Sequence, residues 1–213
     1  MGDAARSGGG FGVALLAAGS SRRFGARDKL AAPFRGRKLG EWAARAVPVE
    51  MFAHRWVIVS SPRHVCAQAW RETGWDPVVN PQAEEGIGSS VACAARHAQS
   101  AGCEALLITL ADMPLVPCEH FAALVKAFDE EAGIVASQAG EGPPQPPVIF
   151  AAHHLPALAL LDGDSGARGL LSRARTIACP REWLTDIDTR AALRHHGQDR
   201  PVDPNARKKG DHT

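Results

Sequence analysis

A short basic segment near the N-terminus has the residue types of a phosphate-binding loop. It follows an apolar run at residues 11–18 and reads GSSRRFGARDK from Gly19 to Lys29. Glycines let the backbone approach a ligand closely, and consecutive N–H groups in a turn form a concave anion site. We interpret the segment as a phosphate-binding loop, and the alternative is an ordinary polar loop after a strand. It contains neither GxxxxGK[ST] nor GxGxxG, so it is not a P-loop and is a poor match to a dinucleotide site.

Three aspartates are candidate ligands for a metal ion. Asp112 comes directly after the apolar run at residues 104–110. A carboxylate at the end of a buried strand is costly unless a cation or donors meet it, and Mg²⁺ prefers carboxylates together with substrate phosphates. Asp186 and Asp188 would point to one side of an extended chain. We expect Asp112 to be a metal ligand together with Asp186 or Asp188, of which we favour Asp188. The alternatives are a helix cap at Asp112 and a solvated turn capped by Thr189.

Two further polar clusters are candidates for ligand contacts. The first extends from Asn80 through Gly86 and Gly88 to Ser90, and it precedes a helical pattern whose N-terminus would offer free N–H groups. The second reads GDSGAR and ends at Arg168, which could reach a phosphate. The alternatives are structural: a capping serine in the first cluster, and an ion pair that only fixes the loop in the second.

The elements that would position these clusters alternate between strand and helix. Apolar runs predict strands at residues 11–18, 55–60, 77–80, 104–110, 133–137 and 147–150. Helical spacing and capping residues predict helices at residues 37–47, 63–73, 87–100, 118–131 and 164–174, and a short one after Thr189. This alternation indicates an α/β protein with three α/β/α layers and a mostly parallel sheet. Ligands of such sheets bind beyond the carboxyl ends of the strands, which places Asp112 beside the basic loop.

Composition sets the wider limits. The 213 residues suit one domain, which we expect at residues 11–196, between a disordered tail at 1–10 and a polar tail at 197–213. A net charge of +1 predicts no broad attraction to nucleic acid or membranes, and no apolar run is long enough to span a bilayer. The five cysteines form no CxxC, so reduced thiols in a cytoplasm are expected. The nine histidines lack metal-site spacing, and we expect surface or structural roles for them.

These motifs, in this order, resemble those of the molybdenum cofactor cytidylyltransferases and the related molybdopterin-guanine-dinucleotide-synthase-like NTP transferases. The basic loop matches LAAGxSxRxG followed by a lysine, and residues 110–114 match LADMP letter for letter. Matches to NPxxxxGxxxS, GDxGAR and DxDT follow along the chain. The resemblance implies the Rossmann-like nucleotide-diphospho-sugar transferase fold. The chain departs from the family at the basic loop, where three residues rather than two separate Gly25 from Lys29.

The resemblance also implies an activity. It is the Mg²⁺-dependent transfer of CMP from CTP to a phosphate of molybdopterin, with release of pyrophosphate. The resemblance gives catalytic roles to Arg23, Lys29 and Asp112, metal ligation to Asp112 and Asp188, and acceptor binding to Arg168. The nucleotide-binding residues that it implies are Leu16, Ala17, Ala18, Gly19, Ser20, Ser21, Arg22, Gly25, Asn80, Gly86 and Ser90.

The choice of nucleotide and acceptor leaves alternatives. CTP is favoured over GTP because the guanylyl branch of the family commonly reads LAGG, whereas a methyl group at Ala18 would narrow the space beside the base. The same chemistry on a sugar phosphate or on methylerythritol phosphate is one alternative. A non-catalytic nucleotide-binding partner of a molybdenum hydroxylase is another. A Rossmann-type oxidoreductase is the third, although the absence of GxGxxG disfavours it.

Overall fold

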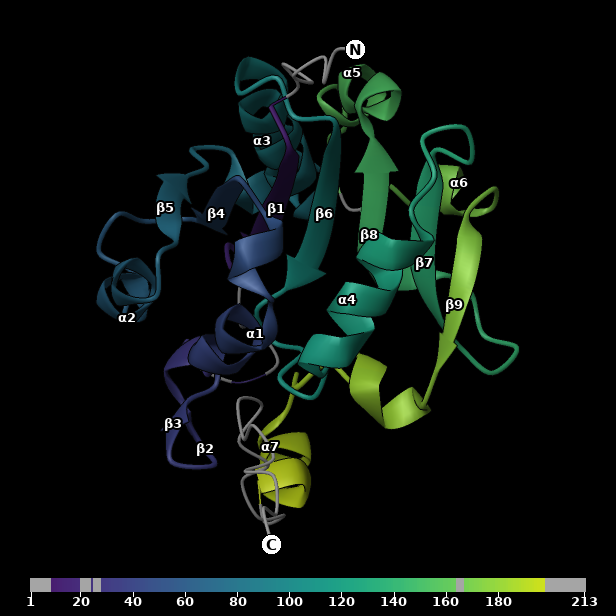
Figure 1. Ribbon diagram of the computed structural model, residues 1–213. Helices are drawn as coiled ribbons and strands as arrows, with labels where there is room; N and C mark the ends of the chain where they lie inside the picture. The colour runs from purple at the N-terminus through teal and green to yellow at the C-terminus, as the bar shows by residue number, and fades with distance from the viewer. Residues whose placement is uncertain (1–8, 20–23, 25–27, 164–166, 198–213) are drawn as a thin grey trace, which may run out of the picture.

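The protein is built on a seven-stranded, mostly parallel sheet with helices on both faces (Figure 1). The computed structural model describes residues 9–19, 24, 28–163 and 167–197. The strand order is β5-β4-β1-β6-β8-β7-β9, and β8 runs antiparallel to both of its neighbours. The strands, in the order of the sheet, are β5 (Asp76–Val79), β4 (His54–Val59), β1 (Phe11–Leu16), β6 (Ala105–Leu110), β8 (Gln145–Ala151), β7 (Ile134–Ala139) and β9 (Arg175–Cys179).

Apolar side chains fill the space on each face of this sheet. In β1, Val13 and Leu15 belong to one apolar cluster and Ala14 and Leu16 to the other, because successive side chains of a strand point to opposite faces. Burial on both sides explains why β1 is a continuous apolar run. Helices that pack on the first cluster are α1 (Gly40–Ala46), α2 (Ala67–Glu72) and α4 (Cys118–Ala127). Those on the second are α3 (Ile87–Ser100), α5 (Leu155–Leu158) and α6 (Arg168–Leu171). The three-layer α/β/α prediction is therefore confirmed.

Two helices begin later than the sequence pattern predicts. The helix expected at residues 37–47 starts only at Gly40, because a small antiparallel hairpin of β2 (Pro33–Phe34) and β3 (Arg37–Lys38) precedes it. Gly36 turns this hairpin with a φ of 84°, a conformation that glycine adopts easily. The helix expected at residues 63–73 starts at Ala67, because the residues before it form turns.

The C-terminal third of the chain differs most from the prediction. The helix expected at residues 164–174 is the single turn α6, with residues 164–166 outside the described part, and β9 follows it at the sheet edge. Because β9 has no fully buried residue, it lacks the apolar signature of a strand. The last helix, α7 (Arg190–Gly197), follows Thr189, whose hydroxyl accepts a hydrogen bond from the Ala192 N–H as a cap does.

The ends of the chain, membrane-spanning helices and cysteines can be compared with the predictions within the described residues. Of the tails predicted at 1–10 and 197–213, residues 1–8 and 198–213 lie outside the described residues. None of the described helices is both long and apolar enough to cross a bilayer. All five cysteines are described, and all are free thiols.

Candidate active site

The segments that follow β1 and β6 lie side by side at the carboxyl edge of the sheet. Leu16 is in register with Leu110, and the Ala111 N–H donates to the Leu16 carbonyl at 3.0 Å. The chain after β1 carries Gly19 and the chain after β6 carries Asp112. Neighbouring parallel strands therefore place the two sequence motifs at one edge, as predicted.

Lys29 joins three distant parts of the chain. Its ammonium donates to a carboxylate oxygen of Asp112 and to one of Asp188, which are 83 and 159 positions away in the sequence. The Lys29 and Asp112 side chains are only 13% and 16% exposed, and that of Asp188 is 39% exposed. The Ile187 N–H donates to the Asp112 carbonyl at 2.9 Å, which fixes the segment of Asp188 next to Asp112. Lys29, the last residue of the predicted basic loop, thus meets Asp112 and Asp188 at one point.

The electrostatics of this point follow from the charges that face one another. Burial lowers the pKa of Lys29, but attraction and hydrogen bonds from Asp112 and Asp188 outweigh burial, so the pKa lies above the ordinary lysine value. Desolvation by the surrounding walls raises the pKa of Asp186 to about 6; the negative charges of Asp112 and Asp188 add to the rise, and Lys29 opposes it. Asp186 is nevertheless an exposed residue, so it faces an open space rather than a closed core.

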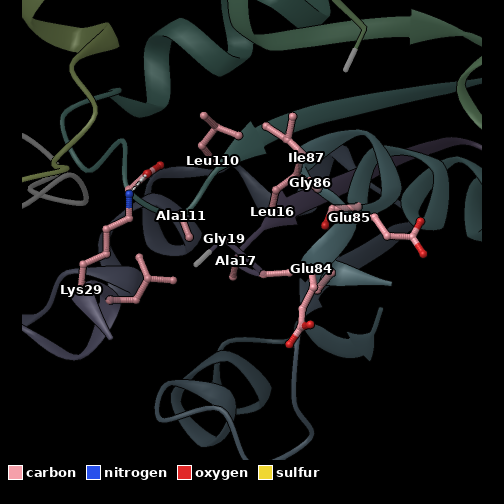
Figure 2. A pocket seen from close by; sticks show the side chains of 15 residues that line it. Leu16, Ala17, Gly19, Lys29, Glu84, Glu85, Gly86, Ile87, Leu110 and Ala111 are labelled. Carbon is pink, nitrogen blue, oxygen red and sulfur yellow. Dashed lines mark hydrogen bonds and ion pairs between the residues drawn. The ribbon is translucent and has the colours of Figure 1, made fainter. Parts of the chain in front are cut away.

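A cavity of about 320 Å³ opens beside Lys29 (Figure 2). Figure 2 shows Lys29 and Ala111 on one side of it and the turn that carries Gly86 and Ile87 on the other. The lining residues are Leu16, Ala17, Ala18, Gly19, Lys29, Leu30, Ala83, Glu84, Glu85, Gly86, Ile87, Ser90, Leu110, Ala111 and Asp112. The cavity therefore combines residues of three of the five predicted motifs, and it has a cationic end and an end bordered by backbone.

Asn80 stabilises the turn and the start of α3 at the end of this cavity opposite Lys29. Its side chain is 1% exposed and donates to the hydroxyls of Ser89 and Ser90 at 2.9 and 3.2 Å, while its carbonyl oxygen accepts the Gln82 N–H at 3.0 Å. Gly86, with a φ of 114°, directly precedes α3, and both serines lie in the first turn of that helix. Ser90 lines the cavity, and Asn80 holds the Ser90 hydroxyl in place from behind the wall. A direct nucleotide contact by Asn80 stays a prediction.

A second, larger cavity of about 710 Å³ adjoins the first. The two share Leu16, Ile87 and Leu110 as wall residues. The wall of the second cavity is mainly apolar, and it contains Arg168 and Asp186 as charged residues within the described part of the chain. Arg168, which was predicted to bind an acceptor, thus borders a space next to the candidate nucleotide cavity.

Comparisons with known proteins agree with this geometry. Residues 13–177 match the MobA-like NTP transferase domain. The chain belongs to the MobA-like NTP transferase family. It is 34% identical over 167 residues to the purine catabolism protein PucB of Bacillus subtilis, covering 74% of this chain and 78% of PucB. It is 32% identical over 185 residues to nicotine blue oxidoreductase of Paenarthrobacter nicotinovorans, covering 81% of this chain and 83% of that protein.

The fold is similarly shared. A nucleotidyl transferase from Methanothermobacter thermautotroptrophicus superposes with a TM-score of 0.72 at 18% identity, covering 89% of this chain and 97% of that protein. The protein thus has the nucleotide-diphospho-sugar transferase fold of this family, as the sequence motifs implied.

The donor set at Lys29 fits a divalent ion. Asp112 and Asp188 both point their oxygens at one cation, the Lys29 ammonium, which marks the place where positive charge is stabilised. Among the described residues no group of three or more histidine, cysteine or acidic side chains is placed to enclose a metal. Mg²⁺ does not need such an enclosure, because it is commonly held by one or two carboxylates together with substrate phosphates and water.

Several predicted contacts fall where nothing is described. Five predicted site residues of the basic loop lie outside the described part of the chain: Ser20, Ser21, Arg22, Arg23 and Gly25. Their roles in phosphate binding and catalysis remain predictions. Conversely, the sequence analysis did not predict Ile87 and Leu110 as site residues, although both line the wall that the two cavities share. An apolar residue that begins a helix directly after a glycine turn, as Ile87 does, was the available signal.

Proposed function

We propose that this protein transfers CMP from CTP to a phosphate of a molybdopterin-type acceptor and releases pyrophosphate, with Mg²⁺ as the metal. The observation that carries the proposal is the junction of two cavities. Lys29 and Asp112 line the smaller cavity, and Asp186, two residues before Asp188, lines the larger. A donor in the first space and an acceptor in the second would meet beside the Lys29 cluster.

The residues of the first cavity suit a nucleoside triphosphate. Lys29 and the N–H groups near Gly19 would hold the phosphates, and the turn at Gly86 would border the base. Ser90 is the candidate base contact, since Asn80 fixes its hydroxyl at the cavity wall. Ala18 also lines this cavity, in keeping with our expectation that its methyl group narrows the space beside the base and favours CTP over GTP.

The chain's own residues would supply orientation and charge to the transfer. An oxygen of the acceptor phosphate attacks the α-phosphorus of CTP, the bond between the α-phosphorus and the bridging oxygen breaks, and pyrophosphate leaves with that electron pair. The attacking phosphate is already ionised, so no general base is needed. Lys29 would offset the charge on the departing pyrophosphate, a type of stabilisation that often contributes most to catalysis. A divalent ion held by Asp112 and Asp188 would supply Lewis-acid stabilisation of phosphoryl oxygens.

The wall of the second cavity bears on the acceptor. Proline, valine, leucine and phenylalanine side chains make up most of it. Sugar hydroxyls placed there would lose hydrogen bonds to water without replacement, which is costly. A flat heterocycle that carries a phosphate is better matched, with Arg168 as the candidate partner of the phosphate. This favours a molybdopterin-type acceptor over a sugar phosphate or methylerythritol phosphate.

The test is to incubate the protein with Mg²⁺, each of the four common nucleoside triphosphates and molybdopterin, and to identify the product by mass. We expect the cytidine dinucleotide of molybdopterin and one pyrophosphate per product. Asp112→Asn should abolish the metal-dependent product and leave the melting temperature near that of the unchanged protein, because the amide keeps the shape of the carboxylate. Product formation by Asp112→Asn with normal metal dependence would contradict the role of Asp112.

Two other functions predict different outcomes, which further measurements can separate from the transfer reaction. A non-catalytic maturation partner of a molybdenum hydroxylase predicts CTP binding without pyrophosphate release, and binding to the hydroxylase that survives Lys29→Ala. An oxidoreductase is a second candidate because one relative bears that name. It predicts oxidation of NADH or NADPH by the protein, which the transferase proposal does not.

A further inference from the structure

The loop between β4 and α2 contacts the segment that carries Lys29. His64 of this loop places its Nε2 at 3.1 Å from a carboxylate oxygen of Asp28. Cys66 of the same loop donates its thiol to the carbonyl of Leu30 at 3.4 Å. The loop therefore holds the chain immediately before and immediately after Lys29.

The position of the His64 ring is fixed by its surroundings. Its Nδ1 accepts the Cys66 N–H at 3.2 Å, so that nitrogen carries no proton and the Nε2 of a neutral ring must carry one. The ring stacks on Trp70 with centroids 4.7 Å apart, and the His64 side chain is 6% exposed. Trp70 is fully buried and donates its own N–H to the Gly40 carbonyl at 2.9 Å. His64 is thus a rigid donor that points at Asp28.

Asp28 transmits this constraint to the turn that presents Lys29. The other oxygen of its carboxylate accepts the Leu30 N–H at 2.9 Å, and its carbonyl accepts the Ala31 N–H at 3.1 Å. Asp28 is therefore the cap of the single turn Lys29–Ala31, in which Lys29 is the first residue. One carboxylate oxygen of Asp28 shapes the turn, and the other ties it to His64.

We propose that His64 is a positioning residue for Lys29 and acts through Asp28. The contact of the His64 Nε2 with the Asp28 carboxylate sets the place of the turn, and the turn sets where the Lys29 ammonium lies relative to Asp112 and Asp188. A reacting group displaced by about 1 Å can lower the rate of an enzyme about 10²-fold, so a rigid support for this turn has a direct catalytic value. The proposal rests on the transferase function for its kinetic consequence, but not for its structural one.

The test compares two substitutions of His64 that differ in reach. Asparagine can accept the Cys66 N–H at the place of Nδ1 but has no donor long enough to meet Asp28. Glutamine can bring an amide N–H to the place of Nε2. We expect His64→Asn to lower kcat about 10- to 100-fold with a smaller change in KM for CTP. We expect His64→Gln to retain kcat within about 3-fold, by the same argument from reach.

A matched control removes a similar ring from elsewhere. His54 stacks on Trp56 with centroids 5.5 Å apart, at the start of β4 and thus at the opposite end of that strand from the loop of His64. His54→Asn should leave kcat unchanged. Melting temperatures of all three variants show whether any loss of kcat reflects a loss of folded protein.

A second measurement does not depend on turnover. The chain has five lysines, so protein labelled with ¹³C at the lysine ε-carbon gives few NMR signals, and Lys29→Arg identifies that of Lys29. The Lys29 signal should move toward that of a free lysine in His64→Asn and return to its original place in His64→Gln. An unmoved Lys29 signal in folded His64→Asn, or equal losses in both variants, would overturn the positioning role. Absence of turnover in every sample with the expected NMR shifts would instead overturn the proposed function.

Discussion

At the scale of single residues, Lys29 stands where a metal ion would be expected. Asp112 and Asp188 carry like charges that repel each other, and the Lys29 ammonium between them removes that repulsion. A divalent cation at the same place would displace the ammonium, and the phosphates of a nucleotide would offer Lys29 a new partner. Metal and nucleotide binding should therefore support each other.

Lys29→Met tests this coupling directly. Without the ammonium the two carboxylates are an uncompensated pair, so we expect Mn²⁺ to bind at least about 10-fold more tightly in the absence of nucleotide, the equivalent of about 1.4 kcal/mol. Turnover should fall about 10²- to 10³-fold, as for loss of one charge-stabilising donor. Electron paramagnetic resonance of free Mn²⁺ measures the first effect. Lys126→Met, in the last turn of α4, serves as the control and should change neither quantity.

Asp186 gives a prediction of pH dependence. Its pKa is raised from 3.8 to about 6, first by desolvation and then by Asp112 and Asp188. A carboxyl group with a raised pKa in the folded state favours folding most below pH 3.8, and this contribution is lost as the pH rises through about 6. Ionised Asp186 thus destabilises the fold at neutral pH, to an extent that solvent screening of this exposed group reduces.

The corresponding variant is Asp186→Asn. It should melt about 2–4 °C higher than the unchanged protein at pH 7.5, and the difference should shrink as the pH falls below 6. Asp162→Asn, at an exposed position, is the control and should show no such trend. A difference in melting temperature that is the same at all pH values would contradict this account of Asp186.

At the scale of elements, the approach of α3 to the chain at Asp162 and Gly163 requires a glycine. The Gly88 N–H donates to the Gly163 carbonyl at 2.8 Å, and a Cβ at Gly88 would lie 2.3 Å from the Asp162 carbonyl oxygen. Backbone atoms cannot yield as a flexible side chain does, so Gly88→Ala must shift either the start of α3 or the 162–163 segment.

We expect Gly88→Ala to cost about 1–3 kcal/mol of unfolding free energy, as overpacking does, and to weaken nucleotide binding. Gly169→Ala in α6 is the matched control, because no atom of the neighbouring described residues lies within 4 Å of a Cβ there. It should be neutral or stabilise the protein by up to about 1 kcal/mol through the helical preference of alanine. Chemical denaturation measures the unfolding free energy of both variants. Equal values for Gly88→Ala and Gly169→Ala would contradict the steric argument.

The elements that the sequence predicts well are those whose signal is local. The apolar run of β1 is continuous because both faces of the strand are covered, and α3 has the predicted bounds because a glycine turn begins it. By contrast, the hairpin β2-β3 has strands of only two residues. The edge strand β9 has a partly exposed pattern that does not distinguish it from a loop.

Some site residues were likewise predictable from local sequence motifs, whereas the roles of others depend on the tertiary structure. Lys29, Asp112 and Asp188 were predictable from motifs, and their convergence followed from the rule that parallel strands gather their carboxyl ends at one edge. The support that Asn80 gives to Ser89 and Ser90 depends on its burial, which the residue type does not reveal. His64 gave no signal, because its partner Asp28 is 36 positions away and no spacing connects them.

At the scale of the whole molecule, two adjoining cavities favour simultaneous binding of both substrates. They share Leu16, Ile87 and Leu110 as walls, and their combined lining comes from both sides of the carboxyl edge of the sheet. Direct attack of the acceptor on the nucleotide, as proposed, requires that both be present together, since the proposed mechanism forms no covalent bond to the chain. A ping-pong enzyme would instead release pyrophosphate before the acceptor binds.

Initial-rate kinetics distinguish these cases. We expect double-reciprocal plots against CTP at several acceptor concentrations to intersect, and labelled pyrophosphate not to exchange into CTP when the acceptor is absent. Arg168→Ala should raise KM for the acceptor about 10-fold or more with little effect on KM for CTP, because the residue borders only the larger cavity, and the size follows from loss of one charge-assisted hydrogen bond. Parallel plots together with acceptor-independent exchange would show that the two cavities do not act as one site for direct transfer.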